Sequence, residues 1–247
     1  MNLRPILVIG PGRGGTSLLT ACLAGHPSIV MRSEYHSTRT LIGDDEPIRS
    51  VATLVDDRLQ HLRFLCDEDR ARHPGLIWGN KITTEQIRGL EEHNFLNNSC
   101  VDVVARFAQA IAEYRPIFII RDGRACVDSK SRRAGSPLMR AALGWCYSVR
   151  VLDRLGSLGA LRTTVRYEEL VRKPAAVLTK VCHALEIDFH PNMLDQTNNE
   201  TLLQPEYRHG RFLHEKATEI PLLPDVVLNV IEPDLRRLGY LSDRDTG

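Results

Sequence analysis

Four glycines within six residues mark the stretch of the sequence that is best suited to binding an anion. Residues 10–17 read Gly-Pro-Gly-Arg-Gly-Gly-Thr-Ser, follow an apolar run and precede a helical pattern of apolar residues. Glycines allow consecutive backbone N–H groups to turn towards one oxyanion, and the positive end of the following helix favours the same charge. A glycine-rich turn without a ligand is the alternative, although so many glycines cost conformational entropy. The pattern therefore predicts a phosphate-binding loop that comprises Gly12, Arg13, Gly14, Gly15, Thr16 and Ser17.

This glycine loop differs from the Walker motif of nucleoside triphosphate enzymes at one decisive position. Its spacing fits G-x-x-x-x-G-K-[ST], but Thr16 stands where the lysine belongs. In those enzymes the lysine reaches the β- and γ-phosphates. A loop that lacks this lysine and adds Arg13 favours a nucleotide with a 5′-phosphate end and no γ-phosphate. A P-loop kinase, or another nucleotide-binding protein that uses Mg-ATP, remains the second interpretation.

A second candidate anion site begins directly after another apolar run, at Arg121. Residues 121–133 read Arg-Asp-Gly-Arg-Ala-Cys-Val-Asp-Ser-Lys-Ser-Arg-Arg and contain five basic residues. A charged face of a solvated helix would explain some of them. Because this stretch follows an expected strand, as the glycine loop does, the pair of stretches predicts a pocket for a second phosphate.

Two further strand ends carry side chains that can take part in acid–base chemistry. Glu34 and His36 follow an expected strand at 28–31, and Lys81 follows one at 76–78, in an expected turn. In open α/β sheets, ligands bind at the carboxyl ends of the strands. We therefore expect these three side chains near the glycine loop, although an isolated lysine in a turn is more often simply solvated.

Strands and helices alternate along the chain, which predicts an α/β fold of three layers, with helices on both faces of a central parallel sheet. We expect one domain over residues 1–247, in which the polar segment 195–219 forms a mobile cover over the site. Apolar runs rich in β-branched residues predict strands near 5–9, 28–31, 76–78, 116–120 and 161–167. Helical periodicity predicts helices at 16–23, 47–69, 84–93, 101–114, 136–156, 174–186 and 225–238.

The composition is that of an ordinary globular protein and argues against several classes of function. The 247 residues carry a formal net charge of +1, so the bulk charge predicts no nucleic-acid partner. Six cysteines without a C-x-x-C pair predict buried reduced thiols and no metal site. The apolar runs are shorter than the roughly 18 residues of a membrane span. Because no signal peptide is recognisable, we expect the protein in the cytoplasm.

Taken together, the two candidate anion sites resemble those of sulfotransferases that use 3′-phosphoadenosine 5′-phosphosulfate (PAPS). In that family a loop similar to residues 11–19 binds the 5′-phosphosulfate, and an arginine with a serine eight residues later binds the 3′-phosphate. Arg121 and Ser129 have this spacing. The order of the other motifs resembles the protein-tyrosine sulfotransferase type, namely Glu34 after His26-Pro27, Asn80-Lys81, Arg121-Asp122-Gly123-Arg124-Ala125 and Tyr167-Glu168-Glu169-Leu170.

Two features depart from that type. Ile82-Thr83 stand where it often has a proline after an Asn-Lys-Asp run, so the local turn is expected to differ. The eukaryotic enzymes of this type carry a membrane anchor and disulfides, for which this sequence gives no signal. The resemblance is therefore to a cytosolic relative of the bacterial style.

The resemblance implies a role for the residues around the 5′ end of the donor. The backbone and hydroxyl groups of residues 12–17 would bind the 5′-phosphosulfate. Arg13 and Lys81 would neutralise the charge that develops during transfer, and no metal is required. Glu34 would take the proton of the acceptor hydroxyl, with His36 as the rival base.

The resemblance also implies how the rest of the donor is bound and what remains open. Arg121, Ser129 and Arg133 would bind the 3′-phosphate, and Tyr167 would contact the adenine side, although such a tyrosine is more often only packed. PAPS would be released as 3′,5′-ADP. The acceptor is a hydroxyl of a peptide tyrosine, a carbohydrate, a lipid or a small molecule. A degenerate protein that binds 3′,5′-ADP and transfers nothing is a third possibility.

Overall fold

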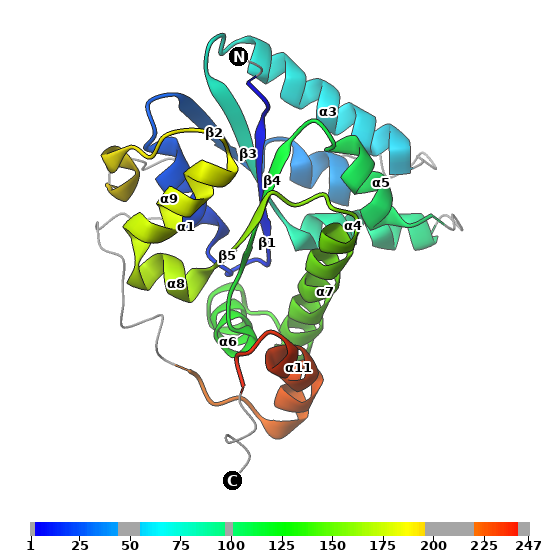
Figure 1. The fold of residues 1–247 in the computed structure, drawn as a ribbon. Helices are drawn as coiled ribbons and strands as arrows, with labels where there is room; N and C mark the ends of the chain where they lie inside the picture. Colours follow the sequence, from blue (N-terminus) through cyan, green and yellow to red (C-terminus); the bar gives the residue numbers. More distant parts are fainter. Residues whose placement is uncertain (1–2, 44–54, 97–100, 196–219, 242–247) are drawn as a thin grey trace.

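A five-stranded parallel sheet forms the centre of the molecule (Figure 1). The computed structural model describes residues 3–43, 55–96, 101–195 and 220–241. The strand order is β2-β3-β1-β4-β5, and every neighbouring pair is parallel. All the carboxyl ends therefore lie at one edge of the sheet. The strands are β1 (Ile6–Gly10), β2 (Ile29–Ser33), β3 (Ile77–Thr83), β4 (Arg115–Ile120) and β5 (Thr163–Arg166).

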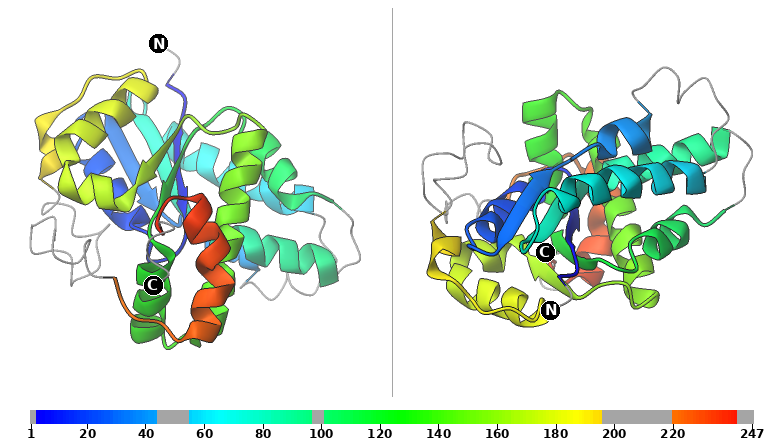
Figure 2. Two further views of the ribbon diagram at one scale, coloured as in Figure 1. Left: turned by 60° about the horizontal axis from the view of Figure 1, so that its bottom comes forward. Right: turned by 90° about the horizontal axis from the view of Figure 1, so that it is seen from above.

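Helices cover both faces of this sheet and continue past its carboxyl edge (Figure 2). On one face lie α1 (Thr16–Ala24), α8 (Tyr167–Arg172) and α9 (Pro174–Ala184). On the other lie α3 (Val55–Ala71), α4 (Thr84–Leu96), α5 (Val103–Ala110) and α7 (Leu138–Ser157). Beyond the carboxyl ends lie α6 (Gly123–Ala134) and α11 (Asp225–Arg237). Two short elements complete the described fold, the π-helix η1 (Thr38–Ile42) and the 3₁₀-helix η2 (Pro191–Leu194).

Two apolar cores, one on each face, follow from the alternation of side chains along the strands. On β1, Ile6 and Val8 belong to the core beneath α1, α8 and α9. Leu7 and Ile9 belong to the core beneath the helices of the opposite face. Because both faces of β1 are buried, the side chains on both faces are apolar, which explains the continuous apolar run of this strand. The three-layer α/β fold predicted from the sequence is confirmed.

Three predicted local features are wrong. Lys81 lies within β3 and not in a turn, because β3 pairs with β2 as far as this residue and with β1 beyond it, up to Thr83. Tyr167 begins α8 and does not end a strand, in keeping with two glutamates in the first turn of that helix. The helix predicted at 101–114 is only α5, which Asp102 caps by accepting the N–H of Ala105 at 2.9 Å.

Some predictions concern parts of the chain that the structure describes only in part. The predicted helix at 47–69 corresponds to α3, which runs past its predicted end, and residues 44–54 lie outside the described ranges. The predicted cover at 195–219 is described only at Asp195, because residues 196–219 lie outside them as well.

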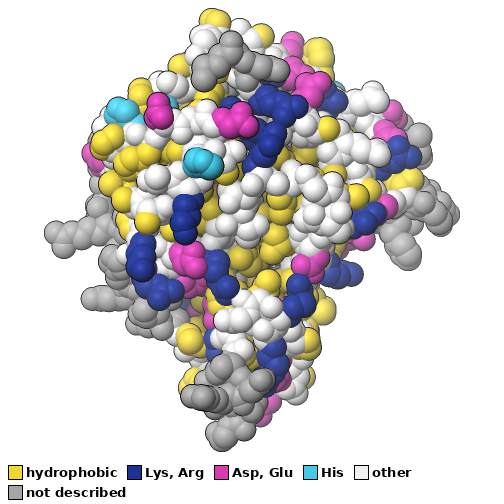
Figure 3. Space-filling model, viewed as in Figure 1, with side chains coloured by type: hydrophobic (Ala, Val, Ile, Leu, Met, Phe, Trp, Pro, Cys, Tyr) yellow, Lys and Arg dark blue, Asp and Glu magenta, His cyan; other side chains and the backbone are white. Residues whose placement is uncertain are grey.

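The face of the molecule in Figure 3 carries charges of both signs, and four of the five described cysteines are buried. Figure 3 shows Lys and Arg side chains interspersed with Asp and Glu over the face it presents. In the described ranges, no helix has the length and apolar character needed to cross a membrane. The five described cysteines are free thiols. Burial raises the pKa of Cys126 to about 12 and that of Cys182 to about 11, so both stay protonated at neutral pH.

Candidate active site

The glycine loop connects β1 to α1 at the carboxyl edge of the sheet. Its turn is closed by the N–H of Gly14, which donates to the carbonyl of Pro11 at 2.9 Å. Gly15 has a φ of 94°, and a Cβ there would lie 2.3 Å from Cδ2 of Tyr167. A residue with a side chain would be strained in this backbone conformation and would collide with the tyrosine ring, so only glycine fits here.

The start of α1 leaves backbone donors for a ligand. Gly15 is the N-cap and has no side chain with which to cap the helix. The first N–H that bonds within the helix is that of Leu19, which donates to the carbonyl of Gly15 at 3.1 Å. The N–H groups of the first turn and the helix dipole together form a site that favours an anion. Thr16, in the position of the Walker lysine, is buried and supplies no charge here.

The second candidate anion site lies directly beside the glycine loop. β4, which precedes Arg121, is the immediate neighbour of β1 in the sheet. The Nε of Arg13 donates to the hydroxyl of Ser129 at 3.3 Å, and Nη1 of Arg121 donates to the carbonyl of Arg13 at 3.2 Å. The guanidinium of Arg121 stacks over the ring of Tyr167, 4.3 Å from its centroid. Residues predicted from separate motifs thus form one cluster.

Two further residues of α6, Cys126 and Arg133, differ in whether the sequence predicts a role for them. The thiol of Cys126, whose pKa is raised by burial, lies 3.8 Å from the carbonyl of Arg13 and donates to it. The sequence pattern assigns this cysteine no role. Arg133 is exposed in the last turn of α6, four residues after Ser129 and so on the same face of the helix. Its part in binding a phosphate stays a prediction.

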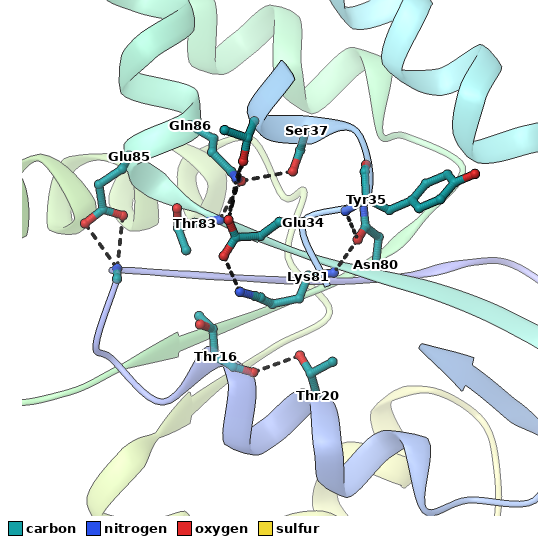
Figure 4. A network of polar contacts seen from close by, with 12 residues as sticks. Thr16, Thr20, Glu34, Tyr35, Ser37, Asn80, Lys81, Thr83, Glu85 and Gln86 are labelled. Carbon is teal, nitrogen blue, oxygen red and sulfur yellow. Dashed lines mark hydrogen bonds and ion pairs between the residues drawn. The ribbon is translucent and has the colours of Figure 1, made fainter. Parts of the chain in front are cut away.

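Glu34, directly after β2, forms an ion pair with Lys81 of the neighbouring strand β3 (Figure 4). The backbone N–H of Glu34 donates to the carbonyl of Lys81 at 2.7 Å, which fixes the turn after β2. The lysine side chain is only 5% exposed and the glutamate side chain 38% exposed. A molecule arriving from solvent therefore meets the carboxylate first, with the ammonium group beneath it.

Polar residues that the sequence pattern does not single out hold this carboxylate in place. The amide of Gln86 donates to Oε2 of Glu34 at 3.0 Å, and the hydroxyl of Thr38 donates to the same oxygen at 3.4 Å. Asn80 braces the turn, because its side chain accepts the N–H of Tyr35 at 3.1 Å and donates to its carbonyl at 3.3 Å. Gln86 is 2% exposed, and only its place in the first turn after the Asn-Lys strand could have pointed to it.

Backbone strain gathers at the same place. Four described residues other than glycine have a positive φ, and three of them are Arg13 at 70°, Glu34 at 54° and His36 at 55°. Such conformations cost about 1–3 kcal/mol each and persist where surrounding contacts enforce them. The ring of His36 packs edge-on against Tyr35, with 4.3 Å between the centroids.

The comparison with protein-family models decides the family. The model of the sulfotransferase family matches residues 5–191, a span that includes both candidate anion sites and the Glu34–Lys81 pair. The chain belongs to the sulfotransferase family. A search of curated proteins found no match.

Solved structures share the fold of this sulfotransferase. The sulfotransferase domain from the curacin biosynthetic pathway has a TM-score of 0.67 at 19% identity, with 96% of this chain and 98% of that chain covered. The sulfotransferase domain of the olefin synthase of Synechococcus PCC 7002 has a TM-score of 0.62 at 19% identity, with coverages of 93% and 94%. A sulfotransferase from Alicyclobacillus acidocaldarius gives 0.53 at 18%, with coverages of 96% and 95%. The resemblance to the tyrosine-specific type stays a prediction.

The remaining family-like motifs of the sulfotransferase have structural contacts. Asp122 caps α6 by accepting the N–H of Arg124 at 2.9 Å, and its own N–H donates to Glu168 at 2.9 Å. The hydroxyl of Tyr240 donates to Glu168 at 3.2 Å, and burial raises the pKa of this tyrosine, so it remains a donor. The carbonyl of Tyr240 accepts from Arg124 at 2.9 Å. These contacts join α6, α8 and the segment that follows α11, next to the candidate anion sites.

Proposed function

We propose that this sulfotransferase transfers a sulfuryl group from PAPS to an acceptor hydroxyl and releases 3′,5′-ADP. The observation that carries the proposal is the contact between Arg13 of the glycine loop and Ser129 of α6. It brings a site suited to a 5′-phosphate end next to a site suited to a further phosphate. ATP has no 3′-phosphate to occupy the second site.

The donor set fits a nucleotide with phosphates at both ends of its ribose. The N–H groups at the start of α1 suit the 5′-phosphosulfate, with the hydroxyls of Thr16 and Ser17 beside them. Arg121 and Ser129 suit the 3′-phosphate, since a guanidinium and a hydroxyl both donate to phosphate oxygens. Tyr167 lies between Gly15 and Arg121, so its first role is to support both sites, and any contact with the adenine comes from its remaining edge.

The Glu34–Lys81 pair supplies a base and a positive charge for the transfer. When bound, PAPS provides an activated sulfuryl group whose bridging oxygen leaves with 3′,5′-ADP. The acceptor oxygen forms the new bond to sulfur while Glu34, the more exposed partner, takes the acceptor proton. The ammonium of Lys81 and the guanidinium of Arg13 offset the negative charge on the sulfuryl and departing oxygens. Sulfuryl transfer of this kind depends mainly on positioning and electrostatics.

The acceptor class is a hydroxyl compound. A phenol with a pKa of about 10 and a sugar hydroxyl both need a base to become nucleophilic at neutral pH. Peptide tyrosines, carbohydrates, lipids and small natural products therefore make up the panel to be tested. A transfer assay with radiolabelled or mass-tagged PAPS against this panel is expected to yield a product heavier by one sulfuryl group.

A calorimetric titration tests the donor before any acceptor is known. We expect 3′,5′-ADP to bind at least about tenfold more tightly than 5′-AMP, which lacks the 3′-phosphate, and more tightly than Mg-ATP. Tighter binding of Mg-ATP would favour the P-loop kinase or ATP-binding alternative. Tight binding of 3′,5′-ADP without transfer to any member of the panel would favour a binding-only protein.

A further inference from the structure

A carboxylate outside the predicted site is in direct contact with the glycine loop. Glu85 accepts the backbone N–H of Gly12 through both of its oxygens, at 3.2 and 3.0 Å (Figure 4). A Cβ at position 12 would lie 2.9 Å from Oε1, so a residue without a side chain allows this close approach. The same oxygen forms an ion pair with Lys130.

The contacts of Glu85 with Gly12 and Lys130 join three elements of the site. Glu85 lies in the first turn of α4, where the helix dipole favours a carboxylate. The next residue, Gln86, holds Glu34 from the same turn. Lys130 follows Ser129 on α6. The first turn of α4 is therefore bonded to the glycine loop, to the proposed base and to the helix of the second anion site.

The contact raises an electrostatic difficulty for a loop that binds an anion. A carboxylate beside such a loop repels a phosphate, and the repulsion is stronger in a partly buried site than in water. The side chains of Lys130 and Glu85 are 24% and 28% exposed, so their mutual attraction is only partly screened. The ammonium group of Lys130 thereby neutralises the carboxylate of Glu85 beside the loop that would bind the donor.

We propose that Glu85 is a positioning residue for the donor loop and that Lys130 neutralises its charge. The hydrogen bond to Gly12 fixes the loop, and the ion pair removes the repulsion that this bond would otherwise bring. The inference rests on the proposed function, because it takes PAPS or 3′,5′-ADP as the ligand of the loop. Lys130 acts on the donor through Glu85 and not by contact with it.

A double-mutant cycle separates the two roles. Calorimetry with 3′,5′-ADP is carried out on the wild type, Glu85→Gln, Lys130→Met and the double variant, with thermal unfolding to verify that each is folded. Lys130→Met exposes the donor to an uncompensated carboxylate, and we expect about tenfold weaker binding. Glu85→Gln keeps an oxygen for Gly12 and should stay within about threefold of the wild type. The double variant should return to that range, because no charge remains to be compensated.

Two further variants complete the design. Glu85→Ala removes the acceptor of the Gly12 N–H, and its binding should fall by about tenfold even though a negative charge is lost. Arg132→Met removes a charge of the same sign from α6 at an exposed residue that pairs with Asp128, and should change binding less than about twofold. In the transfer assay, Lys130→Met should raise the KM for PAPS while kcat at saturating PAPS stays nearly constant.

The outcomes are distinct. A double variant as weak as Lys130→Met would overturn the inference, since the lysine would then act on the donor directly or through the fold. Equal binding by Glu85→Ala and Glu85→Gln would likewise rule out a positioning role for the hydrogen bond. If the wild type does not bind 3′,5′-ADP at all, the proposed function fails, and the inference fails with it.

Discussion

The Nε of Arg13 lies 3.3 Å from the hydroxyl oxygen of Ser129, although 116 positions separate the two residues in the chain. Parallel pairing of β1 with β4 produces this proximity, because it sets the loop after one strand beside the helix after the other. Each residue follows its own apolar strand at the same edge of the sheet. The contact is what turns two separate sequence motifs into a single candidate site for one ligand.

Replacing Ser129 tests whether the second anion site binds a phosphate. Ser129→Ala should weaken the binding of 3′,5′-ADP by about 10- to 100-fold, the usual cost of a lost hydrogen bond to a charged group, and the binding of 5′-AMP much less. Ser131→Ala is the matched control, because it removes a serine hydroxyl from the same helix two residues away and so from another face. Calorimetry with both nucleotides measures the effect. An equal loss for 5′-AMP would contradict a 3′-phosphate site.

Replacing Glu34 tests the assignment of the base. Glu34→Gln should lower turnover by about 100- to 10,000-fold, because the amide cannot take a proton. Its affinity for 3′,5′-ADP should stay within about twofold, since the amide nearly preserves the shape of the side chain. Steady-state kinetics at saturating PAPS, with calorimetry beside it, measures both quantities.

His36→Gln is the companion to this variant. It should keep most of the turnover, because the ring of His36 packs against Tyr35 and Glu34 holds the ion pair with Lys81. The reverse pattern, an active Glu34→Gln and an inactive His36→Gln, would transfer the role of base to the histidine.

The sequence permits prediction of the fold and of the positions at which chemistry gathers. Glycines, apolar strands and strand-end polar residues have local signatures, and a parallel sheet brings the loops after its strands together at its carboxyl edge. Arg13 and Ser129 could be paired in this way, and so could Glu34 and Lys81. The extent of β3 could not be predicted, because pairing with two neighbouring strands extends it past Gly79 and places Lys81 inside the strand.

The residues that position the site left almost no signal in the sequence. Gln86 and Glu85 are adjacent polar residues at the start of a helix, which is an ordinary composition for a first turn. Only the packing of α4 against the sheet directs one to Glu34 and the other to Gly12. Tertiary placement, and not residue type, gives them their contacts.

Gly15 provides a test of how tightly the loop is enclosed. Gly15→Ala has to adopt a φ of 94° and to displace the ring of Tyr167, which would lie 2.3 Å from the new Cβ. We expect it to lower the free energy of unfolding by about 3 kcal/mol or more. Urea denaturation followed by circular dichroism measures the loss.

Gly75→Ala is the matched control for Gly15. Its φ is 80°, but a Cβ there would meet nothing within 4 Å, so it carries only the conformational cost of about 1–2 kcal/mol. Similar losses for the two variants would mean that the ring of Tyr167 moves aside easily. It would then contribute little to the shape of the loop.

The pH dependence of stability should depend on Asp69, which lies near the end of α3. Asp69 accepts Nε of Arg32 at 2.6 Å and Nε1 of Trp78 at 2.9 Å. The hydrogen-bonded guanidinium of Arg32 holds the pKa of this carboxyl below its ordinary value, with burial opposing it. A lowered pKa means that the stabilisation is present above the unfolded value of about pH 4 and is lost as the pH falls through the folded value.

Asp69→Asn should therefore cost most at neutral pH and little in acid. Its side chain is only 6% exposed, so we expect a loss of about 2–4 kcal/mol in the free energy of unfolding near pH 7. Asp102→Asn is the control, because it also removes an ion pair with an arginine, but at a side chain that is 47% exposed. Asparagine can still cap α5, so the free energy of unfolding should fall by less than about 1 kcal/mol. Urea denaturation at pH 7 and pH 3 compares them. A difference between wild type and Asp69→Asn that grows towards pH 3 would reverse the sign of the linkage and exclude the ion pair as its source.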